Sequence, residues 1–290
     1  MPVTSLGPSA NALPLLLAGP AGCGKSTYLA ALLQSIRQNM SKVYGCALYT
    51  PREEDTPAGN DPLCGEDVCP SENAPEPLAY SLIFSGEKPA GNTCAPVFHD
   101  PGGDAFQSEG AVAGIPALPH AKGILLFVDP FGLPGAREQL CLEGPPPPEQ
   151  DPTAVLTRII HALRLSCGPE DPQCGIGVPL AVCLAKLDLI AELLDRSSFV
   201  RHPTRHLREA SFDKTDWRIC DLEVQSLVES WGGGELLSQV RAHFSHHSFF
   251  GVGALGVQPK DNCVTDAAPH RVLDPFLWML WRHKVIHHAT

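Results

Sequence analysis

The sequence GPAGCGKS at Gly19–Ser26 decides the fold, because it stands between two runs of different periodicity. The run before it, Leu13–Ala18, has the length and apolar character of a buried parallel strand. The run after it, Ser26–Met40, carries leucines at helical spacing on one face. A strand, a glycine-rich loop and a helix in this order are typical of an α/β fold.

The rest of the chain continues the alternation of strands and helices. Further strands are predicted at Val43–Tyr49, Leu78–Phe84, Cys94–His99, Gly123–Val128, Pro179–Leu184 and Ser248–Val252. Further helices are predicted at Pro152–Leu165, from a start at Gly232–Gly234 to about Phe244, and at Asp274–His287. We expect a mostly parallel central sheet with helices on both faces. Residues 1–290 are interpreted as one domain with long loop insertions near 50–77, 133–151 and 195–231. The least regular pattern, at Asp188–Trp231, predicts only short helices.

Composition limits the class of protein. The chain has 290 residues, of which 43% are hydrophobic and only 18% charged, with a formal net charge of −11. A strongly acidic surface disfavours nonspecific binding to nucleic acid or anionic lipid. No apolar stretch reaches the ~20 residues of a membrane span, and Ala12–Ala18 is too short for a signal peptide. The 11 cysteines are then most simply reduced thiols, and we expect a cytoplasmic protein.

The octapeptide fits the pattern G-x-x-x-x-G-K-[ST] without a mismatch. Its glycines permit backbone angles and close approaches that a Cβ would block, so that successive N–H groups can cradle phosphates. Lys25 is expected to bridge the β- and γ-phosphates, the Ser26 hydroxyl to bind Mg²⁺, and Thr27 to meet the α-phosphate. The predicted loop contacts to a nucleoside triphosphate are Gly19, Gly22, Cys23, Gly24, Lys25, Ser26 and Thr27.

A second acidic motif, D-x-x-G, follows the strand predicted at Cys94–His99. It resembles the GTPase motif in which the aspartate orients magnesium and the glycine N–H senses the γ-phosphate. Asp100 and Gly103 take these roles by that resemblance. Asp129, at the end of the next strong strand, is the rival magnesium carboxylate; we favour Asp100 because glycines follow it and Phe106 can anchor a switch helix.

A third motif, x-K-x-D, ends the strand at Pro179–Leu184 and resembles the base-reading motif of GTPases. The Asp188 carboxylate can accept hydrogen bonds from guanine N1–H and its exocyclic amine, a pair of donors that adenine lacks there. Lys186 is expected to lay its stem over the base. Ala185 stands where an Asn or Thr normally ties this loop to the phosphate loop. Downstream, Ala254 is the expected backbone donor to guanine O6.

With four motifs in order, the chain resembles a P-loop GTPase of the translation-factor/Ras-like class. More narrowly, it resembles the bacterial double-GTPase group through LLLAGPAGCGKSTYLAALL at Leu15–Leu33, DPGGDAF at Asp100–Phe106 and RVLDPFLWML at Arg271–Leu280. The resemblance implies a small-GTPase-like fold, GTP and GDP as ligands, Mg²⁺ as cofactor, and a switch that signals to protein partners. Lys25, Gly103 and Asp104 are the implied catalytic residues.

Several points stay open at the level of sequence. Asp104 occupies the position that is often Gln in Ras-like enzymes, so intrinsic hydrolysis is in question, and either Thr50 or Thr56 could be the switch threonine. The alternatives are a P-loop ATPase with Asp129 on the magnesium, or a nucleotide-binding interaction module that does not hydrolyse. Structural zinc on Cys64, Cys69, Cys167 and Cys174 is a further alternative, although neither spacing is that of a zinc ribbon.

Overall fold

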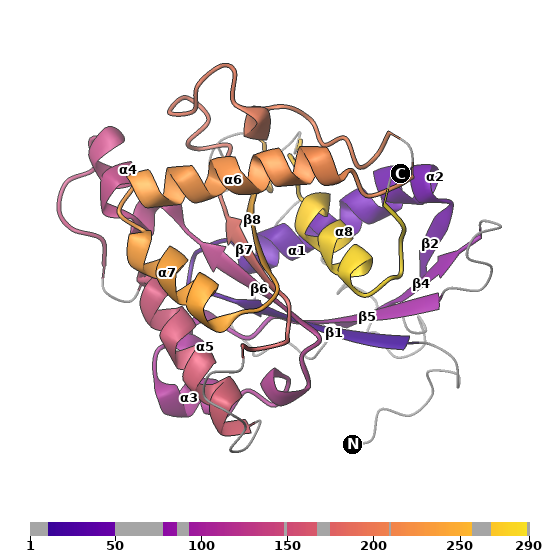
Figure 1. Cartoon of the computed structure of the whole chain (residues 1–290), viewed down its shortest axis with the longest axis horizontal. Coiled ribbons are helices and arrows are strands. Elements are labelled where there is room, and N and C mark those ends of the chain that lie inside the picture. The colour runs from indigo at the N-terminus through magenta and orange to yellow at the C-terminus, as the bar shows by residue number, and fades with distance from the viewer. Residues whose placement is uncertain are drawn as a thin grey trace, which may run out of the picture.

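A mixed sheet of eight strands forms the centre of the protein (Figure 1), which confirms the α/β class. The computed structural model describes residues 11–49, 78–85, 93–147, 150–166, 175–208, 210–256 and 268–288. The strand order is β2-β4-β5-β1-β6-β7-β8, with β3 paired to β5. The strands are β1 (Asn11–Ala18), β2 (Cys46–Tyr49), β3 (Leu78–Ala79), β4 (Ser81–Phe84), β5 (Thr93–His99), β6 (Gly123–Val128), β7 (Leu180–Leu184) and β8 (His247–Gly251).

Five strands, β5-β1-β6-β7-β8, are parallel to one another. Ala18 is opposite Leu126 in the register between β1 and β6. Val128 is opposite Leu184, which in turn is opposite Gly251. The carboxyl ends of these strands therefore meet at one edge of the sheet, and the loops that follow them emerge side by side.

The other part of the sheet is antiparallel, which corrects the expectation of a uniformly alternating chain. β4 pairs antiparallel with both β2 and β5, and β3 pairs antiparallel with β5. The connection between β4 and β5, residues 85–92, is shorter than the dozen or so residues that a parallel crossover needs. The single strand predicted at Leu78–Phe84 is interrupted at Tyr80, whose N–H bonds to Pro96 O.

Helices cover both faces of the sheet, as expected. The α-helices are α1 (Lys25–Ser35), α2 (Ser41–Tyr44), α3 (Glu109–Ala113), α4 (Pro134–Gln139), α5 (Pro152–Ser166), α6 (Lys214–Ser230), α7 (Gly234–His243) and α8 (Leu273–Arg282). Shorter helical turns are η1 (Ile36–Met40), η2 (Gly103–Phe106), η3 (Leu118–His120), η4 (Pro130–Gly132) and η6 (Phe199–Arg201). Side chains of α1 and α8 belong to one buried cluster, and those of α3, α5, α6 and α7 belong to the other.

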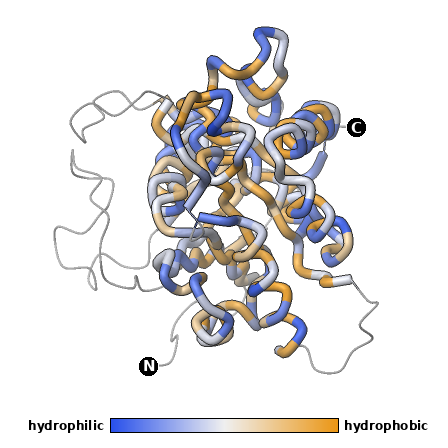
Figure 2. Tube along the Cα trace, turned by 90° about the vertical axis from the view of Figure 1, so that its left-hand side faces the viewer, coloured by the Kyte–Doolittle hydropathy of each residue, from blue (hydrophilic) through white to orange (hydrophobic). Residues whose placement is uncertain are grey.

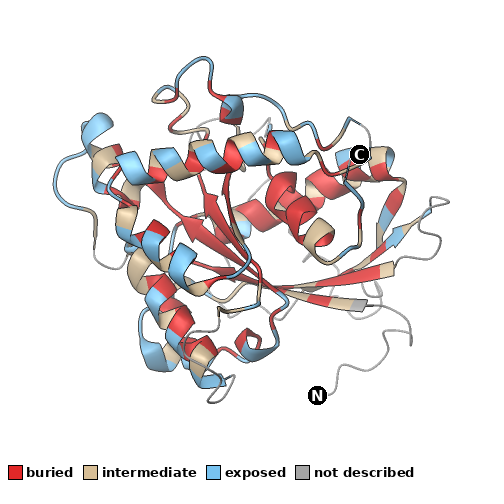
Figure 3. Cartoon of the chain, viewed as in Figure 1, coloured by how far each residue is buried: buried red, intermediate tan, exposed pale blue. Residues whose placement is uncertain are grey.

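The sheet separates the two cores because successive strand residues point to opposite faces. Leu15 and Leu17 pack under α1 and α8, whereas Leu16 and Ala18 pack toward α5 and α7. The parallel strands are buried on both faces, and α8 is buried along most of its length (Figure 3). The hydropathy pattern agrees, since hydrophobic stretches of the chain run through the middle of the molecule (Figure 2).

Three helices differ from their predicted form. The stretch expected to hold only short helices contains α6, a helix of 17 residues that packs along β8. The helix predicted at Ser26–Met40 changes at Ile36 into a π-helical turn, and the one predicted to reach His287 ends at Arg282. No helix in the described ranges is long and apolar enough to cross a membrane.

Candidate functional site

The loop Gly19–Ser26 leaves β1 and enters α1 at the edge where the parallel strands end. Gly19, Gly22 and Gly24 have φ angles of 147°, 73° and 96°, a region that residues with a Cβ rarely adopt. A Cβ on Gly19 would also come within 2.8 Å of Cys23 Sγ and 2.9 Å of Phe127 O. The glycines of the motif are therefore required by the backbone path, as the sequence predicted.

The loop presents backbone donors that bind nothing else in the described part of the chain. The N–H groups of Gly22, Cys23 and Gly24 donate no hydrogen bond there. Gly24 is the N-cap of α1, and the first turn of that helix has no acidic residue to neutralise its positive end. Free N–H groups at a helix N-terminus form a ready anion site.

Lys25 folds back over the loop and is 6% exposed. Its Nζ donates to Gly19 O at 2.8 Å and Pro20 O at 3.1 Å, and lies 3.9 Å from Cys23 Sγ. Burial raises the pKa of the Cys23 thiol, and the charge of Lys25 partly offsets that rise. The ammonium group is thus held at the mouth of the loop, while Thr27 lies half-buried one position beyond Ser26.

Ser26 and Asp100 come together as predicted, although they are far apart in sequence. Ser26 Oγ donates to Asp100 Oδ2 at 2.6 Å. Asp100 Oδ1 is buried and has no hydrogen-bond partner among the described residues, and burial raises the pKa of this carboxyl while Ser26 and Lys25 lower it. A hydroxyl and an unpartnered carboxylate oxygen are hard donors that fit Mg²⁺. The rival, Asp129, is committed elsewhere, because both its oxygens accept hydrogen bonds.

Gly103 lies directly against Ala21 of the glycine-rich loop Gly19–Ser26. A Cβ on Gly103 would fall 2.3 Å from both Ala21 Cα and Ala21 N, so only glycine fits. A cavity of about 250 Å³ opens beside this contact and is also lined by Phe106. Asp104 is exposed, and its Oδ1 accepts from Gln107 Nε2 at 2.8 Å.

Replacing Gly103 with alanine is expected to push the Asp100–Phe106 turn away from the glycine-rich loop Gly19–Ser26. The clash is with backbone atoms, so the free energy of unfolding should fall by about 1–3 kcal/mol, the usual cost of overpacking. Gly102→Ala is the matched control, because a Cβ there meets no atom within 4 Å. Urea denaturation of both variants checks this, and equal midpoints for the two would contradict the contact.

The residues predicted to contact the base lie in the loops after β7 and β8. Asp188 Oδ2 accepts from Gly256 N at 2.9 Å, and Leu187 N donates to Val252 O at 3.1 Å. The loop after β7 and the loop after β8 are therefore joined. Ala254, in the loop after β8, is half-buried and packs on the core.

Lys186 lies beside Asp129 at the end of β6, with Nζ 2.6 Å from Asp129 Oδ2. Both residues are close enough to Cys23 to affect the pKa of its thiol, after burial and Lys25. The loops after β1, β6, β7 and β8 thus bring the predicted phosphate and base residues to one edge. Thr50, Thr56, Cys64, Cys69, Cys167 and Cys174 lie outside the described residues.

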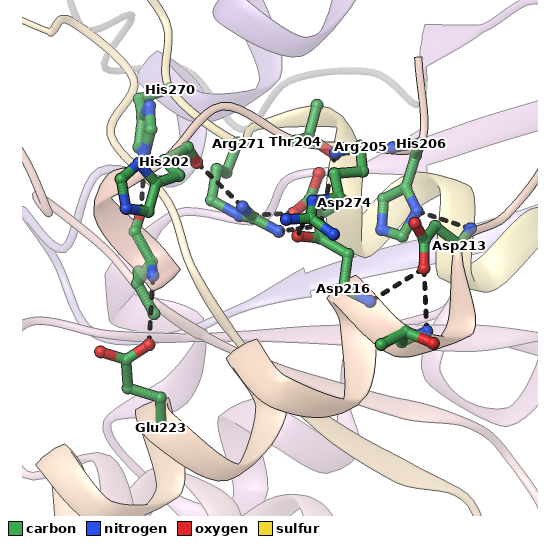
Figure 4. Close-up of polar contacts among 12 residues, drawn as sticks. His202, Thr204, Arg205, His206, Asp213, Asp216, Glu223, His270, Arg271 and Asp274 are labelled. Atoms are coloured by element: carbon green, nitrogen blue, oxygen red, sulfur yellow. Dashed lines mark hydrogen bonds and ion pairs between the residues drawn. The ribbon is translucent and has the colours of Figure 1, made fainter. Parts of the chain in front are cut away.

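A second buried polar cluster centres on Arg271 and was not expected from sequence as a cluster. Arg271 Nη2 lies 2.5 Å from Asp216 Oδ2, and Arg271 Nε lies 2.7 Å from Asp274 Oδ2. Arg271 Nη1 also donates to His202 O at 2.9 Å. Figure 4 shows Arg271 pointing at the aspartates of α6 and α8. The guanidinium therefore joins these two helices to the loop that precedes α6.

His206 completes this cluster, and its ligand atom lies within 4.8 Å of those of Asp216 and Asp274. Such a trio could hold a metal ion, but the Arg271 charge already lies between the carboxylates. Each aspartate is paired with that guanidinium. The Arg271 side chain is only 1% exposed, so it has no room to move away from the carboxylates. We interpret the cluster as a structural junction, since buried carboxylates are stabilised by a paired cation.

His206 is expected to make stability depend on pH. Its ring is fully buried, its Nδ1 accepts from Asp213 N at 3.0 Å, and burial lowers its pKa below the ordinary 6.5. The unfolded chain therefore binds the proton more readily than the folded chain. The contribution of neutral His206 to stability is fully present above pH 6.5 and is lost as the pH falls through the lowered pKa of the folded state.

Denaturation of wild type and His206→Asn between pH 5 and 8 measures this, because Asn can keep an oxygen near the Asp213 N–H. The expected result is a shallower loss of stability at acid pH in the variant. Parallel curves would contradict the assignment, because other histidines contribute equally to both proteins.

Comparisons with known proteins add no family to this geometry. No protein-family model matches the chain, and no curated protein matches it.

Proposed function

We propose that the chain is a P-loop GTPase-like molecular switch. It binds GTP or GDP with Mg²⁺, hydrolyses GTP slowly or with help from a partner protein, and signals to protein partners. The single observation that carries the proposal is a grouping at one edge of the sheet. The loop N–H groups follow β1, the Ser26–Asp100 pair joins the ends of β1 and β5, and Asp188 follows β7, two strands from β1. The resemblance to the bacterial double-GTPase group agrees with it.

Support for a triphosphate comes from the phosphate loop. Lys25 Nζ is already at the loop mouth, where it can exchange the carbonyl oxygens of Gly19 and Pro20 for phosphate oxygens. Ser26 and Asp100 would hold the magnesium, which neutralises phosphate charge when bound. Gly103 lies against the loop and is the group placed to respond to a γ-phosphate.

Support for guanine comes from Asp188. One of its oxygens is fixed by Gly256 N, which aims the carboxylate and leaves the other oxygen available. A fixed carboxylate can accept from the N1–H and amino groups of guanine, whereas adenine offers no such donors there. Ala254 lies in the loop after β8, two residues before Gly256, and we propose its N–H as the donor to guanine O6.

Slow hydrolysis follows from the chemistry at Asp104. Attack of water on the γ-phosphorus breaks the bond to the β-phosphate oxygen, and negative charge spreads over the phosphoryl oxygens. A carboxylate at this position opposes that charge. Because Asp104 is exposed and bonded only to Gln107 among its described partners, a partner protein can reach it.

Titration of the protein with GTP, GDP and ATP, each with and without Mg²⁺, tests the proposal. We expect GTP and GDP to bind in preference to ATP and to need Mg²⁺ for full affinity. Preference for ATP would replace the switch with an ATPase. Single-turnover hydrolysis then separates a GTPase from a binding module, because the module would release phosphate no faster than buffer.

Asp188→Asn is expected to weaken the preference for GTP over ATP by roughly tenfold to 100-fold. The estimate corresponds to one lost charge-assisted hydrogen bond of about 1.5–3 kcal/mol. Asparagine keeps an oxygen for Gly256 N, so the loop itself should hold. Xanthosine triphosphate sharpens the measurement, because its C2 carbonyl can accept from the side-chain amide that this substitution introduces. An unchanged GTP-to-ATP ratio would remove Asp188 from the base site.

A further inference from the structure

The loop that follows β7 lacks a side-chain tether at the position before Lys186. Ala185 is 4% exposed and carries only a methyl group, and its backbone N–H bonds to Val128 O at 2.9 Å. The structure places a different link beside it, because Lys186 Nζ lies 2.6 Å from Asp129 Oδ2. This link joins the ends of β6 and β7, next to the phosphate loop.

We propose that Asp129 is a positioning residue for nucleotide recognition, which holds Lys186 and thereby the base-reading loop through this ion pair. The inference rests on the proposed function, since it concerns the same nucleotide site. It gives Asp129 a role in place of the magnesium role that the sequence left open for it.

The Asp129 carboxylate is itself fixed. It is 4% exposed and follows a strand in which every residue is buried. Asp129 Oδ1 accepts from Phe131 N at 3.0 Å and so caps the turn η4. Because the turn holds Oδ1, the Asp129 side chain has little freedom to rotate, and Oδ2 stays directed at Lys186.

Several contacts restrain the backbone and the side chain of Lys186. Its φ angle is 54°, which is unusual for a residue with a Cβ and persists only when the surroundings impose it. Its Nζ lies 5.3 Å from the centre of the Phe131 ring, and its carbonyl accepts from Leu189 N. The side chain remains 27% exposed, against 5% for Asp129. Lys186 thus keeps some exposed side-chain surface while its ammonium group is paired with Asp129.

The same contacts favour Asp100 over Asp129 as the magnesium ligand. Both of its oxygens are occupied by Lys186 and Phe131, whereas Ser26 pairs with Asp100, whose second oxygen is unpartnered among the described residues. We therefore assign different roles to the two aspartates that follow β5 and β6. Asp100 faces the metal ligand Ser26, and Asp129 faces the base-side lysine.

Asp129→Asn tests the inference, because asparagine keeps the bond to Phe131 N–H but removes the charge that Lys186 needs. Dissociation constants for GTP and ATP with Mg²⁺ are measured for wild type, Asp129→Asn, Lys186→Met and the double variant. We expect Asp129→Asn to weaken GTP binding by about tenfold and to lower the GTP-to-ATP ratio. The double variant should bind no more weakly than Lys186→Met alone.

Asp151→Asn is the matched control, since Asp151 Oδ1 also caps a backbone N–H two residues on, at 2.8 Å, but the residue is exposed. It should bind GTP as wild type does. Unchanged GTP affinity in Asp129→Asn, or additive losses in the double variant, would overturn the ion-pair role. Loss of the Mg²⁺ dependence in Asp129→Asn would instead assign the residue to the metal.

Failure of the inference is distinguishable from failure of the proposed function. If wild type binds no guanine nucleotide in preference to ATP, both fall together. If wild type prefers GTP and Asp129→Asn keeps that preference and affinity, the positioning role alone is lost. Thermal unfolding without nucleotide shows whether each variant is folded. A folded Asp129→Asn with reduced affinity supports the role, and Asp129→Glu, which keeps the charge, should restore part of it.

Discussion

Lys25→Met is expected to weaken GTP binding by about 100-fold or more. The ammonium group can make at least two charge-assisted hydrogen bonds to phosphate oxygens, each contributing about 1.5–3 kcal/mol. Methionine keeps the apolar stem, so the loss falls on the charge. Calorimetric titration should show a larger loss for GTP than for GDP, because Lys25 is expected to reach the γ-phosphate.

Lys42→Met is the control for this result, because Lys42 is exposed on α2 and lies outside the predicted contacts. It should bind GTP as wild type does. Equal affinity of Lys25→Met and wild type would remove the phosphate loop from the nucleotide site. Lys25 also bonds to two loop carbonyl oxygens, so the substitution could weaken binding by destabilising the fold. Unfolding curves without nucleotide show whether Lys25→Met is folded.

Arg271→Met is expected to lower the free energy of unfolding by about 3–5 kcal/mol. The guanidinium is 1% exposed and pairs with two buried aspartates, which the substitution leaves without a counter-charge. Urea denaturation at neutral pH measures the loss.

Arg218→Met is the matched control for burial. Arg218 also pairs with an aspartate three residues away, Asp221, at 3.3 Å, but its side chain is 60% exposed. Exposed pairs contribute about 0–1 kcal/mol. Comparable losses of unfolding free energy for Arg218→Met and Arg271→Met would mean that the buried ion pairs of Arg271 stabilise the fold no more than the exposed pair of Arg218.

The sequence was most informative where spacing is local. The strand, glycine loop and helix around Gly19–Ser26 follow from periodicity and from the angles that only glycine adopts, and the buried strand β6 is apolar throughout. The antiparallel strands were missed because direction depends on the connection, and a short apolar run has the same pattern in either direction. The long helix α6 was missed because it carries many charges and buries only a narrow stripe, including Val224 and Val228.

The candidate site divides in the same way. The Ser26–Asp100 pair was predictable because both residues end or follow parallel strands, whose carboxyl ends meet at one edge. The Asp129–Lys186 and Arg271–Asp216 pairs join residues 57 and 55 positions apart. Nothing in local spacing selects such partners from the other charged residues. Only the packed register of strands and helices does so.

The central place of β1 has a consequence for how the chain folds during synthesis. β1 is synthesised before both of its partners, because β5 and β6 end at His99 and Val128. At ~5–20 residues per second, roughly 5–20 s pass before both partners exist. During that interval the apolar strand has no sheet to join, and contacts of such long range form slowly. We therefore expect Leu13–Ala18 to stay without its two sheet neighbours until β6 has emerged.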